Sequence, residues 1–215
     1  LIRPAEELRK RVVMEVGDGV TSVAPGDHVI LCFAPHCGVC ESCLNGHSNL
    51  CDAHQKATGV MFDGTSRIHV GGEDLTQMGK VGCFAEEAIV PVTGVAKIAP
   101  ELSLRAAALI GCSVTTGVGT AIYAAQVTPG STVAVIGCGG VGLNVVQGAR
   151  IAGAASIIAV DVNDAALEFA GRFGATVGLN PLNGDPVKAI KDMTGGKGAD
   201  FTFEAFGSSE TTTMA

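Results

Sequence analysis

Four cysteines lie within one 15-residue window and are spaced Cys-x2-Cys-x2-Cys-x7-Cys: Cys37, Cys40, Cys43 and Cys51. Four thiolates suit a tetrahedral Zn²⁺ ion, and a shell of four protein ligands leaves no open position for water or substrate. The spacing therefore predicts a structural zinc site rather than disulfides. A ferredoxin-type iron–sulfur site also uses closely spaced cysteines, but its Cys-Pro ending is absent, because Asp52 follows Cys51.

A glycine-rich run, Gly-Cys-Gly-Gly-Val-Gly at residues 137–142, follows an expected strand over residues 132–136 and opens an expected helix over residues 143–152. In this context the run is typical of a dinucleotide-binding turn. The first glycine permits the tight turn, the second lets the backbone approach a pyrophosphate, and the third allows the helix to pack closely on the strand. The pyrophosphate then meets the positive end of the helix. The predicted cofactor-binding residues of this turn are Gly137, Gly139, Gly140, Val141 and Gly142.

Asp161 ends a second expected strand, 19 residues beyond Gly142. A carboxylate at this position can accept hydrogen bonds from both ribose hydroxyls of adenosine and repels a 2′-phosphate, which favours NAD over NADP. The alternative is a glycine-rich turn without a ligand, followed by an Asp that only caps a helix.

The predicted secondary structure that positions these motifs changes near Cys112, from short β-rich runs to alternating helices and strands. Residues 12–100 contain short β-rich runs broken by Gly and Pro, for example residues 84–90. From residue 102, helix-length Ala-rich segments alternate with four apolar strands, which is typical of parallel sheets. These strands are expected at residues 132–136, 157–161, 176–179 and 200–204. The sequence therefore predicts an α/β protein with domains at residues 1–111 and 112–215, the second a partial doubly wound Rossmann sheet.

The cysteine loop and the preceding run Gly-Val-Thr-Ser-Val-Ala-Pro-Gly-Asp-His-Val at residues 19–29 resemble zinc-dependent medium-chain alcohol dehydrogenases, over about residues 12–210. The resemblance implies a GroES-like catalytic domain followed by an NAD-binding domain. It also implies that Cys112 is one ligand of a catalytic zinc and that Thr116 lies beside the nicotinamide. The alternative for Cys112 is a buried thiol at a helix start. In such enzymes the zinc acts as a Lewis acid on the alcohol oxygen while hydride passes to the nicotinamide.

The other two catalytic ligands of the family, a Cys in an N-terminal Cys-Gly-Thr/Ser-Asp-type motif and the His of a Gly-His-Glu motif, are not found in the sequence. Counting back from Val12 places the Gly-His-Glu motif on residues 6–8, which read Glu-Glu-Leu. Both ends of the chain look cut, and the sequence leaves open whether residues 1–11 are native. Because a catalytic zinc needs three protein ligands and an open position, we expect this chain alone to be inactive and its parent protein to be an active dehydrogenase.

Residues 61–67, Met-Phe-Asp-Gly-Thr-Ser-Arg, resemble the formaldehyde dehydrogenase branch of the family and its bacterial relatives. That resemblance implies a primary alcohol, an aldehyde or a thiol adduct as the substrate. The arginine that anchors glutathione in that branch falls at Gln55, which argues against glutathione. Two other readings stay open, namely a non-catalytic module that binds NAD and zinc, and a zinc-ribbon interaction protein.

The composition limits the partners. The formal charge is −7 and no basic run is present, which argues against nucleic acid and anionic membranes. No stretch of 18 apolar residues occurs, and the first seven residues lack the order of a signal peptide. We therefore expect a cytoplasmic protein, and a homo-oligomer when intact.

For five further side chains, the sequence predicts only whether they lie in the core or on the surface. Cys32, Cys83 and Cys138 are expected in the core as small hydrophobic residues. His47 and His54 lie beside the cysteine loop and are expected on the surface rather than among the metal ligands.

Overall fold

The computed structural model describes residues 2–5, 10–57, 59–82 and 85–215. It divides into two compact units, Leu1–Cys112 and Ser113–Ala215, each with its own hydrophobic core. Among the described residues, no helix has both the length and the apolar character that crossing a membrane requires.

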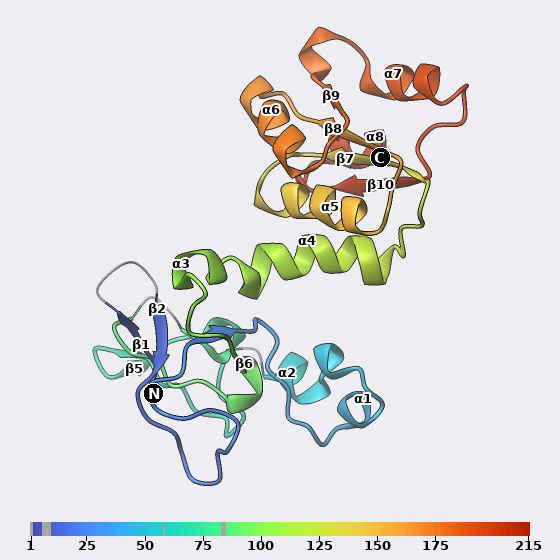
Figure 1. Cartoon of the computed structure of the whole chain (residues 1–215). Coiled ribbons are helices and arrows are strands. Elements are labelled where there is room, and N and C mark those ends of the chain that lie inside the picture. The colour runs from blue at the N-terminus through green and yellow to red at the C-terminus, as the bar shows by residue number, and fades with distance from the viewer. Residues whose placement is uncertain (1, 6–9, 58, 83–84) are drawn as a thin grey trace. The chain divides into compact units, whose positions relative to one another are not determined.

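The first unit is built from short strands that pair two by two in antiparallel fashion, together with short helices (Figure 1). The pairs are β1 with β2, β3 with β6 and β4 with β5. The strands are β1 (Ile2–Ala5), β2 (Lys10–Val13), β3 (Val29–Leu31), β4 (His69–Val70), β5 (Glu73–Asp74) and β6 (Val95–Lys97). The helices are α1 (Glu41–Leu44), η1 (Ser48–Leu50), α2 (Asp52–Lys56), η2 (Met78–Lys80), η3 (Val92–Gly94) and α3 (Leu104–Ala107).

The core of the first unit forms where Val13 of β2 and Val29 of β3 are both buried and pack together. In the described part of the expected β-rich run at residues 84–90, residues 85–87 are bends and residue 88 is a single β-bridge position, so no continuous strand forms there. Glu86 and Glu87 stand side by side there and break the apolar alternation, and Pro91 lacks the N–H that a continuing strand needs.

The second unit contains a four-stranded parallel sheet in the order β10-β7-β8-β9. The strands are β7 (Thr132–Ile136), β8 (Ser156–Val160), β9 (Val177–Leu179) and β10 (Phe201–Glu204). The helices that follow them are α5 (Gly140–Ile151), α6 (Asp164–Phe173), α7 (Pro186–Met193) and α8 (Ser209–Met214). This unit also contains the π-helical segment η5 (Thr120–Ala124) and the 3-10 helix η6 (Pro181–Asn183). The segment η4 (Ile110–Val114) includes residues on both sides of the division between the units. The predicted α/β class and parallel sheet are confirmed, and α5 begins three residues earlier than the sequence suggested.

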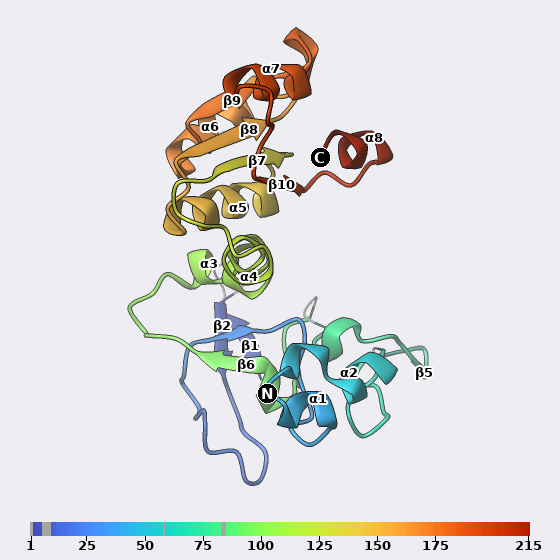
Figure 2. The ribbon, with the colours of Figure 1, turned by 90° about the vertical axis from the view of Figure 1, so that its right-hand side faces the viewer.

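The central strands are apolar throughout because helices cover both faces of the sheet. On one face, Val133 and Val135 of β7 pack against Val145 and Val146 of α5, which lies alongside the sheet in both ribbon views (Figures 1 and 2). On the other face, Ile136 and the neighbouring residues of β8 pack against side chains of α7 and α8. The alternation of side chains along a strand makes this two-sided packing possible.

A further helix, α4 (Thr115–Gly119), packs against α5 within the second unit and leads into η5. A Cβ atom added to Gly117 would lie 2.5 Å from the Cβ of Asn144, and one added to Gly148 would lie 2.8 Å from the Cβ of Ala121. Only glycine fits at these two positions, so the backbones of the α4–η5 segment and α5 approach each other closely.

Candidate zinc cluster and dinucleotide-binding turn

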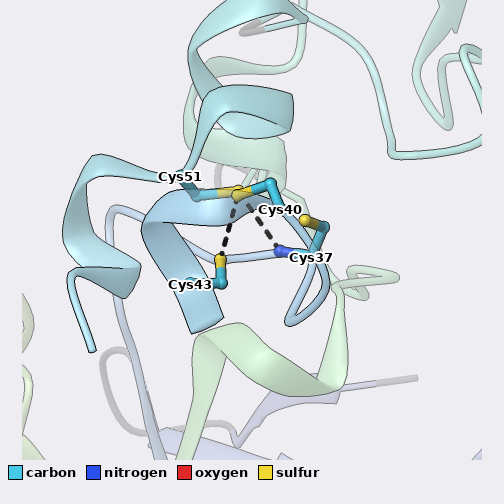
Figure 3. Close-up of side chains that lie close together, drawn as sticks. All are labelled: Cys37, Cys40, Cys43 and Cys51. Atoms are coloured by element: carbon cyan, nitrogen blue, oxygen red, sulfur yellow. Dashed lines mark hydrogen bonds between the residues drawn. The ribbon is translucent and has the colours of Figure 1, made fainter. Parts of the chain in front are cut away.

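The four cysteines of the predicted zinc site come together in the first unit (Figure 3). Their sulfurs all lie within 4.8 Å of one another. Cys40 Sγ is 3.4 Å from Cys43 Sγ and 3.9 Å from Cys51 Sγ. A tetrahedron with Zn–S bonds of about 2.3 Å has edges of about 3.8 Å. The donor set and its spacing therefore fit a zinc ion.

Tight turns and two short helices hold these sulfurs together. Gly38 and Gly46 have φ angles of 80° and 83°, a left-handed conformation that glycine adopts without steric cost. Helix α1 begins directly after Cys40 and carries Cys43, while α2 begins directly after Cys51. The Ser42 hydroxyl of α1 donates a hydrogen bond to the Asp52 carboxylate of α2 at 3.2 Å, which ties the two helices to each other.

The cluster places thiols with different acidities side by side. Burial raises the pKa of the Cys43 thiol to about 12. Burial also opposes ionisation of Cys51, but the backbone N–H groups of Cys37 and His54 donate to its sulfur and lower its pKa to about 6. The first of these bonds, from Cys37 N to Cys51 Sγ, is 3.3 Å long. A divalent cation bound here would have to displace the protons that remain on the other thiols.

The glycine-rich turn of the second unit shows three different uses of glycine. Gly137 has a φ of 91°, which a residue with a side chain rarely adopts. A Cβ atom on Gly142 would lie 1.8 Å from the carbonyl oxygen of Gly137, so α5 can sit this close to the turn only with glycine there. A Cβ atom on Gly139 would meet nothing within 4 Å. The space over Gly139 is open, as it must be where a pyrophosphate approaches the backbone.

The N-terminus of α5 is suited to the same anion. Gly139 occupies the N-cap position and offers no side-chain acceptor to the first turn. The N–H groups of Gly140, Val141 and Gly142 belong to the first turn of a 12-residue helix, where backbone donors have no partner inside the helix. This end of the helix also carries the positive end of its dipole.

Asp161 follows β8 directly and connects to the glycine-rich turn. Its Oδ2 accepts a hydrogen bond from the backbone N–H of Cys138 at 2.8 Å, and its Oδ1 accepts one from Asn163 N at 2.9 Å. Each carboxylate oxygen can accept a second hydrogen bond, so the group can still receive two ribose hydroxyls. The residues present therefore fit a dinucleotide with a free 2′-hydroxyl.

Cys112 lies exposed at the end of the first unit. It lines a mainly apolar cavity of about 200 Å³ together with Leu31, Cys32 and Phe33, so the alternative of a buried thiol is wrong. Within the described residues, the four-cysteine cluster is the one group of three or more side chains of metal-binding type that come together. Residues 6–8, the positions that correspond to the Gly-His-Glu motif of the family, lie outside the described residues.

Thr116 is exposed on α4 in the second unit, beside the glycine-mediated contact of α4 with α5. Its predicted place next to a nicotinamide remains a prediction, as does the role of Cys112 as a catalytic zinc ligand.

Two of the simpler expectations are wrong. Cys32 is exposed, because it follows β3 at the rim of the cavity, and His54 is buried, because α2 turns that side chain inward. Cys138 is buried as expected, and burial raises its pKa to about 11. His47 is exposed as expected. Cys83 lies outside the described residues.

The sequence reading missed Lys80, whose side chain has no solvent exposure at all. The only signal in the sequence is its place between Gly79 and Gly82, in a segment otherwise poor in charge.

Comparison with known proteins gives two family matches. The alcohol dehydrogenase GroES-like domain matches residues 12–100, and the zinc-binding dehydrogenase family matches residues 140–215. The S-(hydroxymethyl)glutathione dehydrogenase of Escherichia coli is 46% identical over 199 residues, which cover 91% of this chain and 54% of that protein. The enzyme of the same name from Saccharomyces cerevisiae is 44% identical over 207 residues, covering 93% of this chain and 53% of the relative.

Solved structures agree with these matches. An alcohol dehydrogenase zinc-binding domain protein from Burkholderia ambifaria superposes with a TM-score of 0.87 at 35% identity, covering 95% of this chain and 56% of the other. Benzyl alcohol dehydrogenase from Acinetobacter calcoaceticus gives a TM-score of 0.82 at 31% identity, with the same shares covered. The chain spans about half the length of the curated relatives it matches. On these grounds the chain belongs to the zinc-dependent medium-chain alcohol dehydrogenase family.

Proposed function

We propose that this chain is the structural-zinc and NAD-binding part of an NAD-dependent dehydrogenase that oxidises a primary alcohol or reduces the corresponding aldehyde. The observation that carries the proposal is the turn at residues 137–142, where Gly142 is sterically required, Gly139 is open, and Asp161 holds the backbone of the turn. The four-cysteine cluster and the two family matches support it.

In this proposal, different residues of the chain bind different parts of the cofactor. The N–H groups at the start of α5 bind the pyrophosphate, and Asp161 accepts the ribose hydroxyls and repels a 2′-phosphate. Thr116 would lie beside the nicotinamide, and Cys112 would contribute one ligand to a catalytic metal. When bound, a catalytic zinc ion supplies Lewis-acid activation of the alcohol oxygen.

The substrate class rests on the relatives and on one position of this sequence. The relatives are named for S-(hydroxymethyl)glutathione, an adduct of formaldehyde with a thiol. Gln55 of α2 is exposed and carries no charge. It stands at the position where the resemblance to the formaldehyde dehydrogenase branch implies a glutathione-binding arginine. We therefore propose a primary alcohol or a different thiol adduct as the substrate, with the intact protein acting as a cytoplasmic homo-oligomer.

A non-catalytic module that binds NAD and zinc is the second candidate, and it is favoured by the absence of a Cys-Gly-Thr/Ser-Asp-type motif and of a Gly-His-Glu motif from the sequence. Titration of the 215-residue chain with NAD and NADP by calorimetry, together with zinc analysis, tests the binding functions. We expect NAD binding, bound zinc and no NADH formation from ethanol or longer primary alcohols. Absence of NAD binding would contradict both candidates.

An activity assay of the natural protein that includes this chain distinguishes the dehydrogenase from the binding module. NADH formation from a primary alcohol, lost on Cys112→Ala, identifies the dehydrogenase. No turnover with any primary alcohol or thiol adduct identifies the binding module.

A further inference from the structure

The order of the strands in the parallel sheet reverses at β7. The chain adds β8 and then β9 on one side of β7, whereas β10 pairs with the other side (Figure 1). In open α/β sheets, ligands bind outside the carboxyl ends of the strands at such a reversal. Two turns leave the sheet there, the glycine-rich turn after β7 and the β10–α8 turn (residues 205–207). The proposed function uses only the first of these turns.

The two turns touch each other through their backbones. Ala205 N donates to Ile136 O at 2.8 Å, which extends the pairing of β10 with β7 by one residue. A Cβ atom added to Gly137 would lie 3.1 Å from both Ala205 C and Phe206 N. The peptide group between Ala205 and Phe206 therefore covers one side of Gly137, the first glycine of the glycine-rich turn. A shift of the β10–α8 turn would leave Gly137 without this support.

The side chain of Glu204, the last residue of β10, holds the β10–α8 turn. Its Oε1 accepts hydrogen bonds from Phe206 N at 2.9 Å, from Gly207 N at 2.7 Å and from the Thr211 hydroxyl at 2.8 Å. The bond from Gly207, followed by those from Thr211 and Phe206, lowers the pKa of Glu204, so the carboxylate is charged at neutral pH. Hydrogen bonds to a charged acceptor are about twice as strong as those between neutral groups. One carboxylate oxygen thus ties the turn to both β10 and α8.

The direction of these hydrogen bonds determines what the β10–α8 turn can offer to a ligand. Successive backbone N–H groups can form a concave site for an anion. Here the N–H groups of Phe206 and Gly207 both donate to Glu204, so they are already used and do not attract a phosphate. The side chain of Phe206, in contrast, is 71% exposed. The pyrophosphate is therefore bound by the start of α5, and the β10–α8 turn suits an uncharged part of the cofactor.

We propose that Glu204 is a positioning residue for cofactor binding, which fixes the β10–α8 turn as the wall of the crevice facing the nicotinamide half of NAD. The topology indicates which half, because Asp161, the proposed ligand of the adenosine ribose, follows β8 on one side of β7 and this turn follows β10 on the other. Glu204 acts through the turn and through Gly137, and does not itself touch the cofactor. The inference rests on the NAD site of the proposed function but does not depend on dehydrogenase activity.

The experiment compares Glu204→Ala and Glu204→Gln with the unmodified chain. Affinities for NAD and for adenosine alone are measured by NMR titration well below the melting temperature, and thermal unfolding is recorded for each protein. Glu204→Ala should lose about tenfold or more in NAD affinity, as for lost hydrogen bonds to a charged group, and should keep its affinity for adenosine. Glu204→Gln still has an oxygen that accepts from the turn, so its NAD affinity should stay within about threefold of the unmodified chain.

Glu210→Ala is the matched control, because Glu210 is exposed on α8 and its loss should change neither affinity. Equal losses for NAD and adenosine in Glu204→Ala, or a lower melting temperature with unchanged NAD affinity, would show that Glu204 only stabilises the fold. A Glu204→Gln variant as weak as Glu204→Ala would contradict the hydrogen-bond mechanism.

If Glu204→Ala gives no folded protein, Glu204→Asp decides the question. Aspartate keeps the charge but is one carbon shorter, so it should not reach the N–H groups of the β10–α8 turn and should show the same selective loss of NAD affinity. Absence of NAD binding by the unmodified chain would instead contradict the proposed function.

Discussion

The carboxylate of Asp161 accepts a 2.8 Å hydrogen bond from the backbone N–H of Cys138. Asp161, which follows β8, therefore fixes the backbone of the glycine-rich turn that follows β7. Asp161 has two separable tasks, because the hydrogen bond needs only an acceptor, whereas repulsion of a 2′-phosphate needs a charge.

Asp161→Asn should narrow the preference for NAD over NADP, because the amide lacks the charge that repels the 2′-phosphate but can still accept from Cys138 N. Asp161→Ala removes both functions and should lower NAD affinity about tenfold or more, as for lost hydrogen bonds to charged groups. Calorimetric titration of each variant with both cofactors measures the two effects. Equal affinity of the unmodified chain for NAD and NADP would show that Asp161 does not select the cofactor.

Two alanine substitutions in the turn should fail in different ways. Gly142→Ala places a Cβ atom against the Gly137 carbonyl and should destabilise the second unit by about 3 kcal/mol or more. Gly139→Ala meets no protein atom within 4 Å and should leave the fold intact while blocking the pyrophosphate. Urea unfolding and NAD titration of both variants separate the effects. A stable Gly139→Ala protein that binds NAD with unchanged affinity would show that the pyrophosphate does not bind at this turn.

Gly171→Ala serves as a positive control for these steric arguments. Gly171 lies inside α6, is exposed, and a Cβ atom there would meet nothing within 4 Å. Alanine favours a helix interior over glycine by about 0.5–1 kcal/mol, so the variant should unfold at a higher temperature and bind NAD as before. A lower melting temperature would mean that this face of α6 has a partner in solution.

Zinc binding should release protons and strengthen as the pH rises. The pKa of Cys43 is raised to about 12, so this thiol is protonated at neutral pH and must lose its proton to bind zinc. Each proton released makes the affinity rise about tenfold per pH unit below that pKa. Calorimetry in buffers of different ionisation enthalpy counts the protons, and Cys43→Ser should weaken zinc binding strongly. An affinity that does not change between pH 6 and pH 8 would contradict this account.

The edge strand of the sheet should promote self-association of the isolated chain. β10 pairs with β7 on one side, and none of the described strands pairs with its other side. Unpaired backbone groups on an exposed edge attract a second strand, and lysine on such an edge discourages this. Thr202 is exposed on β10, so Thr202→Lys should lower the average mass in sedimentation measured over a concentration series. A monomeric unmodified chain at high concentration would refute the prediction.

The parallel sheet and the cysteine cluster could be predicted because each depends on a local pattern. Runs such as Thr-Val-Ala-Val-Ile at β7 are apolar on both faces, and the structure has this strand at the predicted residues. The predicted second strand differs from β8 by one residue at each end. The zinc ligands lie within one short loop, so their spacing in the sequence largely determines their spacing in space.

The burial of Lys80 and His54 could not be predicted in this way. Lys80 is buried because carbonyl oxygens from a segment about 20 residues earlier accept its hydrogen bonds. No local sequence pattern predicts that contact. His54 belongs to a five-residue helix, which is too short for hydrophobic periodicity to show which side faces inward. The exposure of Cys32 follows from its position at the rim of a cavity, which is a tertiary property.

The close approach of the α4–η5 segment and α5 has a consequence for how these helices can change over evolution. Gly117 faces Asn144, and Gly148 faces Ala121, with no room for another carbon atom at either glycine. A mutation at one of these positions cannot be accommodated by trimming its partner alone, because backbone atoms such as the Val141 carbonyl oxygen also stand in the way. The two helices are therefore expected to be inherited as a matched pair, and chimeras of related proteins should be joined outside residues 115–151 rather than between these helices.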